Sequence, residues 1–152
     1  MTHREWPDIA GRLLEGGHVL PVRIYYEDTD FSGLVYHAGY LRFMERGRSD
    51  FLRLIGVGHG ALAAEEGSPG FAVRRMAIEF HRPARMDDLV EVETKLAELT
   101  GSRIILAQRV LREDHCLAEA EVTVAIVDKT GRPRRIPTSI RDHLKGLTEP
   151  LA

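Results

Sequence analysis

Cysteine is nearly absent from this sequence, in which Cys116 is the single example. One cysteine excludes a framework of internal disulfides and is typical of a reducing compartment, so we expect a cytoplasmic location. No apolar run approaches the roughly 18 residues that a membrane-spanning helix needs. The first residues also lack the apolar segment of a secretory signal. We therefore expect no membrane span and no export.

Neither sign of charge is in surplus, because 21 Lys and Arg stand against 23 Asp and Glu. Nucleic-acid-binding proteins usually carry a strongly basic face, so we expect no nucleic-acid partner. The sequence also lacks the G-x-S-x-G, P-loop, C-x-x-C and H-E-x-x-H motifs. These absences argue against a serine hydrolase of the elbow type, a P-loop enzyme and the common zinc sites.

The chain has 152 residues, which predicts one domain. Residues 1–18 are expected to form an N-terminal extension, in which Trp6, Ile9, Leu13 and Leu14 allow a short helix. The domain proper would span residues 19–152. Apolar residues at helical spacing predict a long helix over residues 40–55, with a shorter one at residues 139–147. Alternating or β-branched runs predict strands at 19–26, 71–80, 89–98, 103–112 and 117–127.

This order of elements predicts an α+β fold, in which an antiparallel meander curls around the long helix. Gly47 falls on the apolar face of that helix, which a close approach to the sheet would explain. The outer face of the sheet would carry Glu91, Glu93 and Lys95. Cys116 is expected to pack in the core, in line with Ala118, Ala120 and Val122. On the helix surface, Arg46 and Asp50 have the spacing of an ion pair.

Residues 25–40 hold three carboxylates, a histidine and four tyrosines between a strand and a helix. Loops on a rigid scaffold often carry catalytic groups. The helix start offers unpaired N–H groups that can hold a developing oxyanion. A nearby carboxylate could attack a carbonyl or activate water. Asp28 and Asp30 could equally be turn formers, with His37 an ordinary polar residue. A third hypothesis is a metal site built from Asp28, Asp30 and His37.

The segment VRIYYEDTDFSGLVYHAGYLRFMERGR, residues 22–48, resembles the signature of the hotdog-fold acyl-CoA thioesterases. It is most similar to the YbgC-like branch of the 4-hydroxybenzoyl-CoA thioesterase family, which is linked in bacteria to the Tol–Pal cluster. The resemblance extends through FAVRRM, PARMDDL, AEAEV and RRIP, and covers roughly residues 21–140. It implies a five-stranded antiparallel sheet around the long helix. It also implies a homodimer or homotetramer with active sites at the dimer interface.

The resemblance further implies roles for single residues. Asp30 matches the family's catalytic carboxylate, and His37 matches a catalytic histidine seven residues later. The backbone N–H of Tyr36 or His37 would polarise the thioester carbonyl. Tyr26, Gly33 and Tyr40 match positions around the substrate. The pattern departs from the family at Phe31-Ser32 and at Gly39, beside the expected acyl pocket.

The expected activity is hydrolysis of an acyl-CoA without a metal, with coenzyme A entering only as part of the substrate. An acyl carrier protein is a further candidate partner. Two alternatives stay open, a hotdog-fold hydratase or dehydratase and a non-catalytic docking protein. The basic loop 131–135 could be a solvated turn or a phosphate clamp. Basic residues at loop ends are candidates for contacts to coenzyme A phosphates, namely Arg82, Arg85, Arg103 and Arg132.

Overall fold

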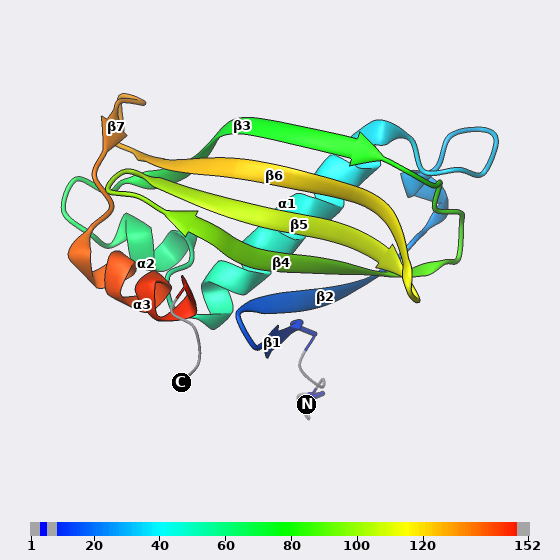
Figure 1. Cartoon of the computed structure of the whole chain (residues 1–152), viewed down its shortest axis with the longest axis horizontal. Helices are drawn as coiled ribbons and strands as arrows, with labels where there is room; N and C mark the ends of the chain where they lie inside the picture. The colour runs from blue at the N-terminus through cyan, green and yellow to red at the C-terminus, as the bar shows by residue number, and fades with distance from the viewer. Residues whose placement is uncertain (1–3, 6–8, 149–152) are drawn as a thin grey trace.

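The structure, a computed structural model, describes residues 4, 5 and 9–148 (Figure 1). Five long strands form one antiparallel sheet, flanked by the short strands β1 and β7. The sheet order is β1-β2-β4-β5-β6-β3, with β7 beside β6. The strands are β1 (Arg12–Leu14), β2 (Gly17–Arg23), β3 (Gly70–Phe80), β4 (Leu89–Leu99), β5 (Arg103–Arg112), β6 (His115–Val127) and β7 (Pro133–Arg134).

The sheet wraps around one long helix, α1 (His37–Leu54), which lies across its inner face (Figure 1). A 3-10 turn, η1 (Tyr26–Asp28), precedes α1, and α2 (His59–Ala63) follows it. The helix α3 (Thr138–Thr148) ends the described chain. This confirms the α+β hotdog architecture of five long strands around a central helix. In the part of the chain that the structure describes, no helix combines the length and apolar character needed to cross a membrane.

The predicted meander is only partly correct. It holds for β4, β5 and β6, but β3 lies at the far edge beside β6 instead of pairing with β4. The connection over residues 81–88 therefore crosses one end of the sheet. It is long enough to do so, and hydrogen bonds fix it there: the Val35 N–H donates to the Ala84 carbonyl at 2.9 Å, and the Met86 N–H donates to the Gly33 carbonyl at 3.2 Å.

Helix α1 lies close to the sheet at Gly47, as its sequence position predicted. A Cβ at Gly47 would lie 2.7 Å from Cγ1 of Val92 and 3.2 Å from Oγ1 of Thr94. Phe43 and Phe51, which flank this position on the same face, are fully buried. Burial of one such side chain contributes about 1.5–3 kcal/mol. The glycine thus allows the helix to bring its large apolar side chains into the sheet.

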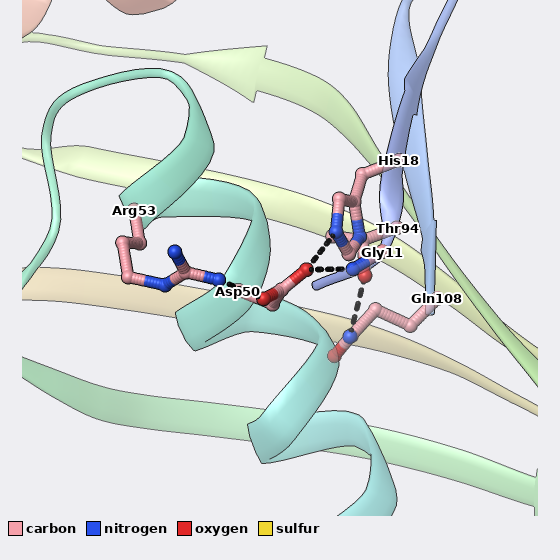
Figure 2. Close-up of polar contacts among 6 residues, drawn as sticks. All are labelled: Gly11, His18, Asp50, Arg53, Thr94 and Gln108. Carbon is pink, nitrogen blue, oxygen red and sulfur yellow. Dashed lines mark hydrogen bonds and ion pairs between the residues drawn. The ribbon is translucent and has the colours of Figure 1, made fainter. Parts of the chain in front are cut away.

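A small polar network occupies the same interface. The buried Gln108 donates from Nε2 to Oγ1 of Thr94 at 2.9 Å (Figure 2). The same Nε2 donates to the Met44 carbonyl, also at 2.9 Å. Its Oε1 accepts from Arg48 at 3.0 Å. Buried polar groups are tolerated when they are hydrogen-bonded. Gln108 therefore links β5, β4 and α1 beside Gly47.

Asp50 connects the second half of α1 to β2 and to Gly11, the residue before β1 (Figure 2). Its Oδ2 lies 2.6 Å from Nε2 of the buried His18 and accepts the Gly11 N–H at 2.7 Å, while Oδ1 pairs with Arg53. Partial burial acts to raise the pKa of Asp50, but the bonds from Gly11, His18 and Arg53 outweigh it and lower the pKa below its usual value. The sequence predicted an ion pair between Asp50 and Arg46, but the arginine that pairs with Asp50 is Arg53.

The N-terminal segment also differs from expectation. Residues 12–14 form strand β1 in place of the short helix, and β2 begins at Gly17. The positive φ of Gly16, 73°, makes the turn between the two strands. The segment 12–18, assigned to the extension, thus belongs to the sheet, and Trp6 lies outside the described residues.

Cys116 does not pack in the core, and a β-bulge is the reason. The register of β5 against β6 shifts where Val110 pairs with Ala118 but Leu111 pairs with Cys116. The extra residue, Leu117, and its neighbour Ala118 are both fully buried. The alternation of faces is therefore interrupted, which leaves Cys116 half-buried and near the exposed Glu119.

Candidate active site

The two aspartates of the acidic segment between β2 and α1 differ in their exposure to solvent. Asp28 is buried, and its Oδ2 accepts the Tyr25 N–H at 2.8 Å. Asp30 is exposed, two residues further along. Asp28 therefore organises the turn η1, whereas Asp30 is the carboxylate that a ligand can reach.

Asp30 lies at the base of a small loop that precedes the helix. Its N–H donates to the Leu34 carbonyl at 2.9 Å, and the adjacent pair Thr29 and Val35 forms a β-bridge. Gly33, with a φ of 80°, makes the reversal that a residue with a side chain would adopt with strain. The loop thus returns the chain from Asp30 directly to the start of α1.

The Asp30 carboxylate is held ionised by its neighbour. The hydroxyl and the backbone N–H of Ser32 both donate to its Oδ1, the latter at 2.8 Å. These two bonds lower the pKa of Asp30 below its usual value. Among the described residues, no hydrogen bond reaches Oδ2. One carboxylate oxygen is therefore fixed and the other is available for chemistry.

Helix α1 begins at His37, with Tyr36 as the N-cap residue. The Gly39 N–H donates to the Tyr36 carbonyl at 2.9 Å, and no side chain caps this end. Among the described residues, the N–H groups of His37 and Ala38 therefore stay open to a ligand oxygen. Tyr36 packs edge-on against the His37 ring, with centroids 6.2 Å apart, and its hydroxyl accepts from Arg42 at 3.0 Å. The helix start therefore combines an exposed imidazole with unpaired backbone donors.

A pocket of about 320 Å³ opens beside the helix start. Gly39 lets the first turn approach its wall, since a Cβ there would lie 2.8 Å from Cγ1 of Val35. Pockets for small molecules usually begin near 300 Å³, so this one suits a short group. The lining residues are Val35, His37, Tyr40, Phe80, His81, Arg82 and Pro83.

Tyr40 is a wall residue with a structural bond. Its buried hydroxyl accepts the Ala84 N–H at 2.9 Å, which fastens the crossing connection to α1. Burial raises the pKa of Tyr40, so the phenol stays protonated at neutral pH. Its ring also packs against Phe80, with centroids 5.5 Å apart.

The structure brings only some of the predicted site residues together. His37, Tyr40 and Arg82 line the pocket, and Arg85 lies next to Leu34 of the Asp30 loop through a β-bridge. Tyr26 is 80% exposed in η1 and does not line the pocket. Asp28, Asp30 and His37 do not gather their ligand atoms within the described residues, which removes support for the metal hypothesis.

The four candidate arginines divide between the two ends of the sheet. Arg82 follows the end of β3, at the pocket, and its Nη1 lies 3.2 Å from Nδ1 of His115. Arg103 begins β5 and Arg132 lies in the turn before β7, both at the opposite end (Figure 1). Within one chain, Arg103 and Arg132 are therefore too remote to share a ligand with the pocket.

Phe80, His81 and Pro83 were not expected at the site. They enter it because the crossing connection begins where β3 ends, directly over the start of α1. Arg112 supports this connection, since its Nη1 donates to the Pro83 carbonyl at 3.1 Å and to Asp88 at 2.8 Å. In the sequence, the signal that could have indicated this role was an aromatic residue followed by His-Arg-Pro at the end of a predicted strand.

Comparisons with known proteins agree with this geometry. The family profile of the Thioesterase-like superfamily matches residues 25–144. The chain belongs to this superfamily.

Two curated relatives support the family at the level of sequence. An acyl-CoA thioester hydrolase, YbgC, of Escherichia coli O6:H1 is 44% identical over 127 residues, which cover 82% of this chain and 93% of the relative. The acyl-CoA thioesterase YbgC of Haemophilus influenzae is 44% identical over 137 residues, covering 88% and 100% respectively.

A solved structure supports the family at the level of the fold. A probable thioesterase from Bartonella henselae superposes with a TM-score of 0.76 at 43% identity, covering 80% of this chain and 99% of that one. The stretch matched by the superfamily profile begins at Tyr25 and includes the Asp30 loop, the start of α1 and the whole pocket. Strand β1 and all of β2 precede it.

Proposed function

We propose that this chain hydrolyses an acyl-CoA thioester to the free acid and coenzyme A. The observation that carries the proposal is the close similarity to two bacterial acyl-CoA thioesterases along nearly their full length. The geometry supports the same reaction, because an ionised carboxylate, an imidazole and open helix N–H groups lie at one end of the sheet. No observation specifically favours the hydratase or docking-protein alternatives.

In the proposed mechanism, the thioester carbonyl oxygen is bound by N–H groups at the start of α1, around Tyr36 and His37. The negative charge that develops on this oxygen is stabilised by the donors and by the positive end of the helix dipole. Asp30 acts through its available oxygen, either attacking the carbonyl carbon or taking a proton from the attacking water. The C–S bond then breaks, and the coenzyme A thiolate takes up a proton. On the route in which Asp30 attacks, water then hydrolyses the acyl–Asp30 anhydride, which releases the free acid and restores the carboxylate.

His37 has a positioning role in this scheme. Its ring lies on the pocket wall and packs against Tyr36, so it can orient the thioester or the water relative to Asp30. The scheme requires no metal and no separate cofactor. Chelation with EDTA is therefore expected to leave turnover unchanged, whereas recovery of lost turnover by one divalent ion would refute a metal-free reaction.

The pocket volume restricts which part of the substrate it can hold. A space of about 320 Å³ accommodates a short acyl group or the thiol end of the pantetheine arm, not the whole of coenzyme A. Arg82 and Arg85 are exposed beside it and are the proposed contacts for phosphate groups, because arginine pairs well with phosphate oxygens. An acyl carrier protein, which presents a similar arm, is a further proposed substrate carrier.

We also propose that the chain forms a homodimer or homotetramer through the edge strand β3. Among the described residues, strand β3 pairs with β6 on one side only, and Val73 and Phe80 on it are 49% and 48% exposed. An open edge with apolar side chains favours pairing with a second copy. Light scattering is expected to give a mass of at least twice 17.1 kDa. A stable monomer at micromolar concentration would contradict this. Two further parts of the proposal have different grounds: a cytoplasmic location depends on the single cysteine, and a Tol–Pal link depends on the family resemblance.

The direct experiment measures free thiol released from a panel of acyl-CoA thioesters, with an acyl carrier protein thioester included. Short acyl groups should be hydrolysed at a rate well above the uncatalysed background. Hydration of an enoyl-CoA in the same preparation, without thiol release, would favour the hydratase alternative. Absence of both activities across the panel would favour the alternative of a non-catalytic docking protein.

A further inference from the structure

Three residues that the proposed reaction does not use gather on the outer face of the sheet, next to the pocket. They are His81, Cys116 and Glu119, whose ligand atoms all lie within 4.8 Å of one another. Nε2 of His81 lies 3.3 Å from Oε1 of Glu119, with the two side chains 40% and 49% exposed. From this convergence we infer that His81, Cys116 and Glu119 form a binding site for a zinc-class divalent cation.

The backbone explains why these side chains meet. The bulge at Leu117 interrupts the alternation of β6, so Cys116 comes within reach of Glu119 instead of entering the core. The Leu117 carbonyl also accepts the N–H groups of His81 and Arg82, at 2.8 and 3.1 Å. His81 is therefore held across from the bulge by its own main chain.

The donor set fits zinc in type and spacing. Zinc binds imidazole nitrogen, thiolate and carboxylate at roughly 2.0–2.3 Å, which sets tetrahedral ligand atoms roughly 3.3–3.7 Å apart. The pair His81 and Glu119 already has that separation, and the exposed side chains can close the remaining gap. A thiolate and a carboxylate neutralise the dication. On binding, the thiol proton passes to solvent, and the fourth position is open to water.

A neighbouring carboxylate also favours a cation. Glu79 lies directly across from Glu119 in the β3–β6 ladder, and like charges at paired positions destabilise a sheet. A bound dication would relieve that repulsion. Two arginines oppose a cation here. Arg109 lies directly across from Glu119 in the β5–β6 ladder, but its guanidinium pairs with Glu93 at 2.8 Å. The guanidinium of Arg82 contacts His115 rather than any of the three ligands.

Metal binding here would affect the pocket, because His81 is also one of its lining residues. Holding His81 on the metal fixes one wall and is expected to reduce turnover. This second step rests on the proposed function, whereas binding itself does not.

The test titrates zinc chloride into the full-length protein, previously dialysed against a chelator, and follows binding by calorimetry. The wild type should bind one equivalent per chain. Cys116→Ser and Glu119→Gln should each weaken binding at least ~10-fold. His115→Asn is the matched control, since it changes the histidine next to Cys116, and it should bind as the wild type does. Cobalt in place of zinc should give a thiolate charge-transfer band that Cys116→Ser lacks.

Equal zinc affinity in the wild type and Cys116→Ser would overturn the site. A loss of zinc affinity in the His115→Asn control as large as that in Cys116→Ser would also overturn it. Thermal melts identify any variant that fails to fold. In that case, the thiolate band of the cobalt-loaded wild type decides whether Cys116 is a ligand. Turnover is measured separately. Zinc should inhibit the wild type but not Cys116→Ser, and inhibition of both would overturn the link to the pocket. If no acyl-CoA is hydrolysed, the proposed function fails while the titration still decides the metal site.

Discussion

Replacing Gly47 by alanine tests the close packing of α1 on the sheet. The new Cβ would lie 2.7 Å from Cγ1 of the fully buried Val92, where carbon contacts normally need about 3.5–4.0 Å. Overpacking of this kind costs about 1–3 kcal/mol. The same Cβ would lie 3.3 Å from Nε2 of Gln108, and disturbing one of that group's hydrogen bonds costs about 1 kcal/mol more.

Alanine also offers a gain, because it favours helix over glycine by about 1 kcal/mol. The net loss for Gly47→Ala is therefore about 1–3 kcal/mol, which lowers Tm by roughly 2–12 °C in a chain of this size. The matched control is Gly146→Ala in α3, where a Cβ would meet no atom of the described residues within 4 Å. That variant should gain up to about 1 kcal/mol.

The assay is thermal and urea unfolding of both variants at one fixed protein concentration, since assembly makes stability depend on concentration. The two substitutions should move the free energy of unfolding in opposite directions. If Gly47→Ala is stabilised as much as Gly146→Ala, the helix does not approach the sheet as described.

Two further predictions concern single polar groups. Tyr40→Phe removes the acceptor of the buried Ala84 N–H and should cost about 1–3 kcal/mol of stability, measured by urea unfolding; an unchanged midpoint would show that this bond does not fasten the connection. The folded state lowers the pKa of Asp50 below 3.8, so its contribution is present at neutral pH and is lost as pH falls through the folded pKa. Asp50→Asn should therefore be less stable than the wild type at pH 7, and the difference should shrink in acid; a constant difference from pH 7 to pH 2 would contradict this.

Much of the fold follows from local patterns. The alternation of apolar and charged residues predicted β4 and β5 to within a residue, because one face of each strand is buried and the other is exposed. The position of β3 did not follow, since pairing with β6 joins residues far apart in sequence and a linker of eight residues permits either edge. The error at Cys116 has a local cause, because the extra residue at Leu117 takes Cys116 off the buried face that Ala118, Ala120 and Val122 keep.

The site was predictable in part for a different reason. Asp30 and His37 stand in one dense segment that the family resemblance picks out, whereas His81 reaches the pocket only through the crossing connection. Arg103 and Arg132 could have been set aside from topology alone. In an antiparallel sheet, the start of β5 and the end of β6 lie opposite the end of β3, so these arginines are far from Arg82.

The most direct test of the central claim compares Asp30→Asn with Asp28→Asn in steady-state hydrolysis of the best acyl-CoA. Asp30→Asn keeps the shape of the side chain and removes the charge, so the turnover number should fall at least ~100-fold while Tm stays near the wild-type value. Asp28→Asn should cost turnover much less, because that buried side chain organises the turn. His37→Ala should fall between the two if it positions the substrate. Near-full activity of a folded Asp30→Asn variant would contradict the mechanism.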